Sequence, residues 1–171
     1  MLSMTFVFWA LVGLFALVGA MRGWAKEILV TFTVILALFI YSVAITYLAP
    51  IKQLLAPPIS STEFWILTFL FVVLVMFGYQ TPVLTRFASG KLRRERFTDA
   101  FLGFFLGAFN GYLIVGTIWY FMALADYQLP GVVPPSPVPL IVQYLPPEWL
   151  TVPWVFLAVI ISFLFVIIVF I

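Results

Sequence analysis

The stretch Gly19-Ala20-Met21-Arg22-Gly23-Trp24-Ala25-Lys26-Glu27 decides the fold of this chain. An apolar run without a charged residue precedes it, and a second long apolar run follows it. Each run is about as long as the ~20 apolar residues that a transmembrane helix needs. Gly23 permits a tight reversal because it has no Cβ. The stretch therefore predicts a short charged turn between two membrane-spanning helices.

The composition of the whole chain also indicates a membrane protein. Of its 171 residues, 65% are hydrophobic and 8% are charged, whereas soluble domains average about 25% charged residues. A soluble domain of this size still exposes roughly 30% of its surface, so lipid must be the solvent for most of these side chains. Cysteine and histidine are absent, which excludes disulfides, Cys/His metal sites and imidazole catalysis. We expect no catalytic residue, no metal site, no cofactor and no nucleic-acid binding.

Five apolar segments predict an all-α integral membrane protein, a bundle of about five transmembrane helices. The first four form a membrane domain over residues 1–125. A proline-rich loop over residues 126–153 precedes a C-terminal transmembrane helix at 154–171. Ser60 and Glu63 have the spacing of a capping box, which marks the start of the third helix. The spans of the membrane domain are about 4–21, 28–49, 64–85 and 98–125.

Three glycines in the fourth span recur every four residues, at Gly103, Gly107 and Gly111. Residues four apart share one face of a helix. A face made of glycines lets the backbone of another helix approach closely. The repeat therefore predicts a helix-packing face, and a narrow pore or a groove for lipid is the alternative interpretation.

Positive charges gather in the first and third predicted loops. Loops on that side of the membrane hold seven basic residues, whereas the opposite side holds only Lys52. The positive-inside rule assigns the basic side to the cytoplasm. We therefore expect the N-terminus outside, the proline-rich loop outside and the C-terminus in the cytoplasm. The seven basic residues are Arg22, Lys26, Arg86, Lys91, Arg93, Arg94 and Arg96.

Glu27 and Asp99 each lie near the start of a span that begins on this basic side. The helix dipole favours an acidic side chain at such a position. The pattern predicts a charge layer that fixes helix ends. An ion or proton site is the alternative, although two carboxylates without histidine or a polar path through the spans make a poor relay. One half of the layer is the Gly19–Glu27 turn, and the other half comprises Arg93, Arg94, Arg96 and Asp99.

The turn also carries a family resemblance. Gly19-x-x-Arg22-Gly23-x-x-Lys26-Glu27, between two apolar spans, resembles the bacterial CvpA family, the colicin V production proteins. Asp99-x-x-x-Gly103-x-x-x-Gly107-x-x-x-Gly111 looks like the glycine-rich final helix of that family. The resemblance covers roughly residues 5–125. It implies a polytopic inner-membrane protein related to colicin production or export.

The chain departs from the family pattern at three places. Asn110 stands where family members usually have arginine, and Ala100 stands where they commonly have arginine. The C-terminal span is unlike the usual tail of the family. A role in the family that depends on either arginine is therefore not carried over to this chain.

Composition and resemblance together predict a non-catalytic scaffold or accessory subunit of an assembly in the inner membrane. Its expected partners are membrane lipids and either other membrane protein subunits or further copies of itself. The alternative is a small channel or transporter component formed by oligomerisation. Such a channel would use the polar features Gln80-Thr81-Pro82 and Asn110-Gly111, which interrupt the apolar spans.

Overall fold

The computed structural model describes residues 3–80, 96–129 and 140–170, and every regular element within these ranges is a helix. The chain is an all-α membrane protein, as its composition predicts. Four helices, α1, α2, α4 and α5, are long and apolar enough to cross a membrane, and α7 is shorter. The α-helices are α1 (Met4–Arg22), α2 (Trp24–Tyr47), α3 (Ala49–Leu54), α4 (Ser61–Tyr79), α5 (Arg96–Leu124), α6 (Pro146–Trp149) and α7 (Trp154–Phe170), and η2 (Leu140–Tyr144) is a 3₁₀ helix.

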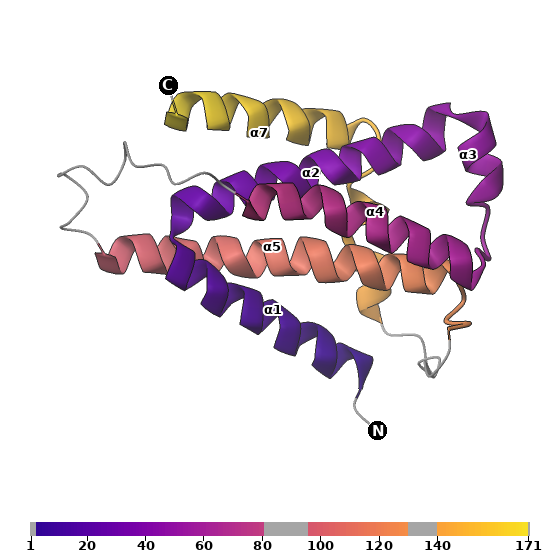
Figure 1. The fold of residues 1–171 in the computed structure, drawn as a ribbon, viewed down its shortest axis with the longest axis horizontal. Coiled ribbons are helices and arrows are strands. Elements are labelled where there is room, and N and C mark those ends of the chain that lie inside the picture. The colour runs from indigo at the N-terminus through magenta and orange to yellow at the C-terminus, as the bar shows by residue number, and fades with distance from the viewer. Residues whose placement is uncertain (1–2, 81–95, 130–139, 171) are drawn as a thin grey trace.

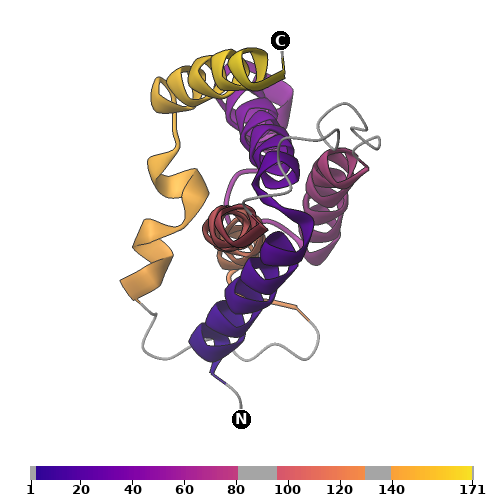
Figure 2. The same ribbon diagram turned by 90° about the vertical axis from the view of Figure 1, so that its left-hand side faces the viewer.

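Helix α5 lies at the centre of the bundle (Figure 2). Its most extensive contact is with α1, and α2 and α4 also pack against it. The segment from η2 to α6 covers a further side of α5. Helix α7 packs on α2 instead, and runs back along it in the opposite direction at the outside of the bundle (Figure 1).

The connections alternate between the two ends of the bundle (Figure 1). The α1–α2 junction and the start of α5 lie at one end, and α3 and the start of α4 lie at the other. This arrangement brings the Gly19–Glu27 stretch next to the first turns of α5. Residues that are some 75 to 83 positions apart in the chain therefore come into contact at this end.

The reversal between α1 and α2 is tighter than the predicted turn. Helix α1 ends at Arg22 and α2 begins at Trp24, so Gly23 alone separates them. Gly23 has a φ of 85°, a left-handed conformation that glycine adopts without a Cβ clash. The second span was predicted to begin near residue 28. It begins earlier because the chain reverses within one residue, and Glu27 consequently lies in the first turn of α2.

The predicted capping box at the start of α4 is confirmed. The Ser60 side chain accepts a hydrogen bond from the Glu63 backbone N–H at 3.3 Å. The Glu63 carboxylate accepts one from the Ser60 backbone N–H at 2.6 Å. Helix α4 ends at Tyr79 with Gln80 as its C-cap, and residues 81–85 of the predicted span lie outside the described residues.

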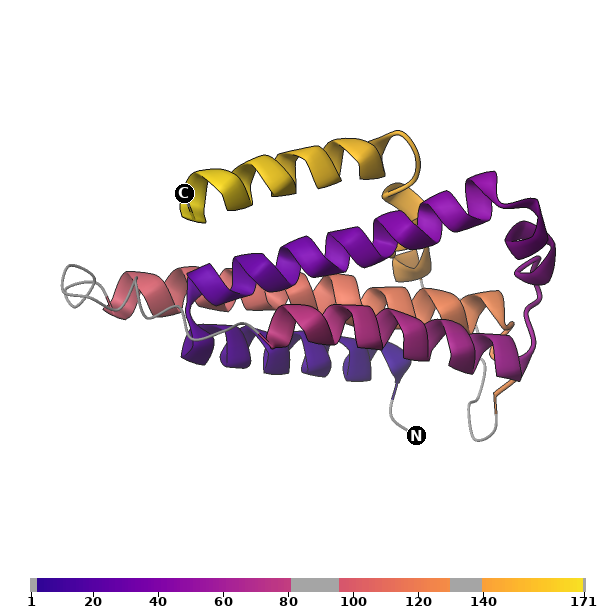
Figure 3. The same ribbon diagram turned by 45° about the horizontal axis from the view of Figure 1, so that its top comes forward.

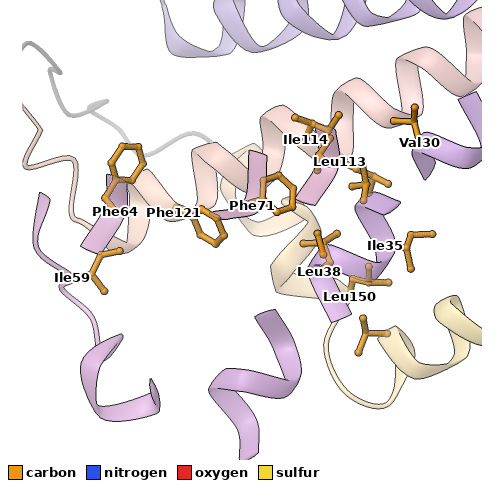
Figure 4. Packing of buried hydrophobic residues seen from close by; sticks show 14 of the residues in the cluster. Val30, Ile35, Leu38, Ile59, Phe64, Phe71, Leu113, Ile114, Phe121 and Leu150 are labelled. Atoms are coloured by element: carbon orange, nitrogen blue, oxygen red, sulfur yellow. The ribbon is translucent and has the colours of Figure 1, made fainter. Parts of the chain in front are cut away.

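The main core lies between α2, α4 and α5 (Figure 4). Leu38, Phe71 and Phe121 each have at most 3% of their surface exposed and belong to this cluster, in which the Phe71 and Phe121 rings meet edge to face with centroids 6.0 Å apart. Leu150 and Val155, from the C-terminal part of the chain, are buried in the same cluster. Lipid is as apolar as these side chains, so close packing rather than exclusion from water holds the helices together.

Part of the proline-rich segment folds back onto α5. The Tyr112 hydroxyl donates a hydrogen bond to the Tyr144 carbonyl and accepts one from Trp149 Nε1, the latter at 3.1 Å. A Cβ atom added to Gly116 would lie 2.7 Å from Pro146 Cδ. Gly116 therefore makes room for the start of α6 against the centre of the bundle.

Candidate functional site

Helices α1 and α5 meet backbone to backbone at glycines. A Cβ atom added to Gly19 would lie 2.2 Å from the Gly103 carbonyl oxygen and 2.7 Å from the Gly107 Cα. One added to Gly111 would lie 2.6 Å from the Phe15 Cβ. These separations are too short for any side chain. The three α5 glycines thus lie against α1 of the same chain, and Gly19 is the α1 side of this glycine contact.

Asp99 lies beside the α1–α2 junction. Its Oδ1 accepts a hydrogen bond of 3.1 Å from the Trp24 backbone N–H, although the two residues are 75 positions apart. Helix α2 has no side-chain cap of its own, because the preceding residue is Gly23. Asp99 therefore caps α2 from a neighbouring helix and places a negative charge at the positive end of its dipole. A Cβ atom on Gly23 would lie 2.7 Å from Asp99 Oδ2, so this contact also requires glycine.

Glu27 is buried where α1, α2 and α5 meet, with 1% of its surface exposed. Its Oε1 forms an ion pair with Arg22 Nη1 at 2.7 Å. Its Oε2 accepts a hydrogen bond of 2.9 Å from Asn110 Nδ2. A buried carboxylate is costly unless it is paired and hydrogen-bonded, and both oxygens of Glu27 are satisfied here.

Asn110 is fully buried and uses its whole amide group in this network. Besides the carboxylate, Nδ2 donates to the Glu27 backbone carbonyl at 2.9 Å. On the other side of the amide, Oδ1 lies 2.7 Å from Thr31 Oγ1. The Thr31 hydroxyl has one proton and lies within reach of both Asn110 Oδ1 and the Glu27 carbonyl, the latter at 3.0 Å. Asn110 thereby fixes the first turn of α2 against the middle of α5.

Arg22 extends the network to α4. Its guanidinium carbon lies 4.4 Å from the centre of the Tyr79 ring, within the roughly 6 Å reach of a cation–π interaction. The Arg22 side chain is 19% exposed, so it forms the outer edge of the network. Side chains from all four long helices consequently meet at the same end of the bundle.

Among the remaining residues of the predicted charge layer that the structure describes, Lys26 and Asp99 lie outside this network. Lys26 is exposed. Arg93 and Arg94 lie outside the described residues, as does the side chain of Arg96, whose backbone begins α5. The Asp99 carboxylate accepts its hydrogen bond from the Trp24 backbone N–H and is not a partner of Glu27. Within the described residues, the helix cap at Asp99 and the buried network at Glu27 are separate contacts.

Sequence reasoning did not identify Asn110 and Thr31 as partners of Glu27. A signal was present in their spacing. Asn110 follows Asp99 by eleven residues, which is close to three helical turns, so both lie on one face of α5. Thr31 follows Glu27 by four residues and shares its face of α2. A polar residue at each of these positions indicates a contact between the two faces.

The chemistry of the network is internal neutralisation of a charge. Near the α1–α2 junction, the Glu27 carboxylate binds the Arg22 guanidinium and the Asn110 amide. The Asn110 amide also binds the Thr31 hydroxyl. Within residues 3–80, 96–129 and 140–170, no three Asp or Glu side chains converge as metal ligands would. The network instead fixes the positions of α1 and α2 relative to α5.

These features define a polytopic membrane protein in which the first helix packs on the glycine face of a long central helix. A family model described as "Colicin V production protein" matches residues 4–136. The chain belongs to this family, which confirms the family membership that the sequence resemblance implied. No curated protein and no solved structure matches the chain. The family match ends before α6 and α7.

Proposed function

We propose that this protein is a non-catalytic scaffold or accessory subunit of an assembly in the bacterial inner membrane. The description of its family suggests an assembly involved in colicin production or export. The polar groups of Arg22, Asn110 and Thr31 are engaged with Glu27 or with one another within the chain, so their role is to hold the shape of the bundle. We infer that a partner binds through the surface that the bundle presents to the membrane.

The observation that carries this proposal is a row of exposed phenylalanines on the first half of α5. Phe97, Phe101 and Phe105 are spaced by four residues and are 82%, 51% and 56% exposed. The Phe97 and Phe101 rings stack with centroids 6.2 Å apart, and the Phe101 and Phe105 rings meet edge to face at 4.8 Å. Phe104 and Phe109, each 40% exposed, widen this aromatic face.

The aromatic face suits another transmembrane helix. It lies on the side of α5 opposite the glycine face, because Phe105 is two residues from Gly103 and Gly107 and a helix turns about 200° over two residues. Association in lipid depends on shape and on van der Waals packing, and aromatic pairs gain about 0.5–1.5 kcal/mol beyond the burial of their area. Four rings in mutual contact, with Phe109 beside them on the same half of α5, therefore favour a transmembrane helix of a partner subunit as the occupant.

Site-specific photocrosslinking in cells tests the proposal. A benzophenone-bearing phenylalanine replaces Phe101 or Phe105, and the products are separated by mass after irradiation. The matched control carries the same group at Phe6 on α1, which is 61% exposed but lies outside the aromatic face. We expect a discrete adduct with a second membrane protein from the two α5 positions and none from Phe6.

Two other outcomes would contradict the proposal that the protein is a scaffold or accessory subunit. Adducts at twice the mass of the chain would favour the alternative, a channel or transporter component formed by oligomerisation. Absence of any protein adduct from both α5 positions would mean that the aromatic face contacts lipid only.

A further inference from the structure

Helices α2 and α4 touch at one end and diverge toward the other. In the last turn of α4, a Cβ atom added to Gly78 would lie 2.0 Å from Thr33 Oγ1 on α2, so the two helices are in close contact there. Toward α3 the helices separate (Figure 3). The short helix α3 spans the open end, and the space between α2 and α4 has the form of a wedge.

The wedge contains an apolar groove of about 310 Å³. This volume is at the lower end of the ~300–1,000 Å³ range of small-molecule sites. Phe71 and Phe121 lie among its lining residues in the interior, and both are buried. Other lining residues, including Ile40, Ile66 and Leu70, are 45%, 53% and 54% exposed. The groove therefore opens sideways toward the lipid.

The groove is long and follows the helix axes. On α4 its lining extends from Glu63, in the first turn, to Leu74. Leu74 follows Glu63 by eleven positions, which at a rise of about 1.5 Å per residue is about 16 Å along the helix. The hydrocarbon core of a bilayer is ~30 Å thick, so one leaflet is about 15 Å deep. The groove thus runs from the membrane interface to about the middle of the bilayer.

We propose that this groove binds one acyl chain of a phospholipid from the leaflet at the α3 end. Its depth matches a single leaflet, and its opening faces the hydrocarbon region. Among the lining residues that the structure describes, Glu63 alone is charged, and its carboxylate already binds the Ser60 backbone N–H, so the groove favours an aliphatic chain over a polar ligand. At the interfacial end, α3 carries the exposed Lys52, whose ammonium group complements a lipid phosphate. The bound chain fills the wedge and supports α2 against α4.

Native mass spectrometry of the whole protein, extracted from membranes in a mild detergent, tests the proposal. Ala44 is half-buried and lines the groove, and Ala44→Phe fills it. Ala10 on α1 is exposed and does not line the groove, so Ala10→Phe adds the same ring elsewhere. We expect one retained phospholipid in the wild type and in Ala10→Phe, and at least a tenfold loss of that species in Ala44→Phe. Equal retention in both variants, or detergent as the only bound molecule, would overturn the proposal.

A second measurement needs no variant and holds even if Ala44→Phe fails to fold. The wild-type protein is reconstituted into vesicles of phosphatidylethanolamine and phosphatidylglycerol that contain a phospholipid with a photoreactive diazirine in its acyl chain. We expect adducts to concentrate on peptides from α2, α3 and α4 that line the groove. Adducts distributed equally over the lipid-exposed faces of α1 and α7 would show that the groove has no preference for the chain.

Discussion

Gly19 and Gly107 lie in direct backbone contact, since a Cβ atom added to Gly107 would come within 2.8 Å of the Gly19 Cα. We expect Gly107→Ala to destabilise the protein, because the methyl group has to push α1 away from α5. Overpacking of this kind typically costs about 1–3 kcal/mol. The measurement is the free energy of unfolding in detergent micelles, followed by circular dichroism.

Gly13 provides the matched control for this prediction. It lies on the same helix as Gly19, but a Cβ atom there would meet nothing within 4 Å. Alanine in a helix interior is favoured over glycine by about 0.5–1 kcal/mol. Gly13→Ala should therefore leave the stability unchanged or raise it. Equal losses in Gly13→Ala and Gly107→Ala would show that the glycine contact has no special role.

The buried network predicts strong coupling between Glu27 and Asn110. Glu27→Ala leaves Arg22 without its carboxylate partner, and removal of one member of a buried ion pair typically costs about 3–5 kcal/mol. Asn110→Ala removes two donors to Glu27 and should cost about 1–3 kcal/mol. The loss of stability in the double variant should be smaller than the sum of the losses in the two single variants by about 0.5–3 kcal/mol. The same unfolding assay measures all three.

The control for this cycle pairs Glu27→Ala with Glu148→Ala. Glu148 is exposed on α6 and has no contact with the network, so the two losses should add. Additive losses in the Glu27/Asn110 pair as well would contradict the coupling.

The cap at Asp99 predicts a difference between two substitutions. Asparagine can still accept the hydrogen bond from the Trp24 N–H, whereas alanine cannot. Loss of an N-cap acceptor costs about 0.5–2 kcal/mol, so Asp99→Ala should lower the melting temperature in detergent while Asp99→Asn lowers it less. If both variants melt together below the wild type, the charge of Asp99 rather than the hydrogen bond supports α2.

The predicted sidedness of the bundle is testable with single cysteines, because the natural chain contains none. Lys26 and Lys52 are both exposed and belong to opposite ends of the bundle. An impermeant maleimide added to intact spheroplasts should label Lys52→Cys, and should label Lys26→Cys only after the membrane is permeabilised. The cysteine-free wild type measures background labelling. The reverse pattern would invert the orientation that the positive-inside rule assigns.

The helices were predictable from the sequence because apolar runs of membrane-spanning length admit few alternatives. The start of α2 was placed too late, since Lys26 and Glu27 look unsuited to a helix packed in the bundle. Arg22 and Asn110 remove that objection by neutralising and hydrogen-bonding Glu27, but this is a property of the folded chain. A charged residue in a sequence does not disclose the distant partner that permits its burial.

The glycine repeat illustrates the same limit. A spacing of four residues defines a face on α5, yet nothing in that spacing says which helix covers it. Gly19 belongs to the family motif of the turn, and its place opposite Gly107 depends on the angle at which α1 crosses α5. Asn110 interrupts an apolar span and was an argument for a channel, whereas in the structure its amide is fully engaged with Glu27 and Thr31.

The long sequence separation between Glu27 and Asn110 has a consequence for how the protein enters the membrane. Asn110 is synthesised 83 residues after Glu27, which at 5–20 residues per second is a delay of roughly 4–17 s. During this interval the newly inserted α1–α2 hairpin has an incomplete set of partners for its carboxylate. The Arg22–Glu27 ion pair lies within the hairpin itself and can form at once. It therefore lets the hairpin reside in the bilayer until α5 arrives.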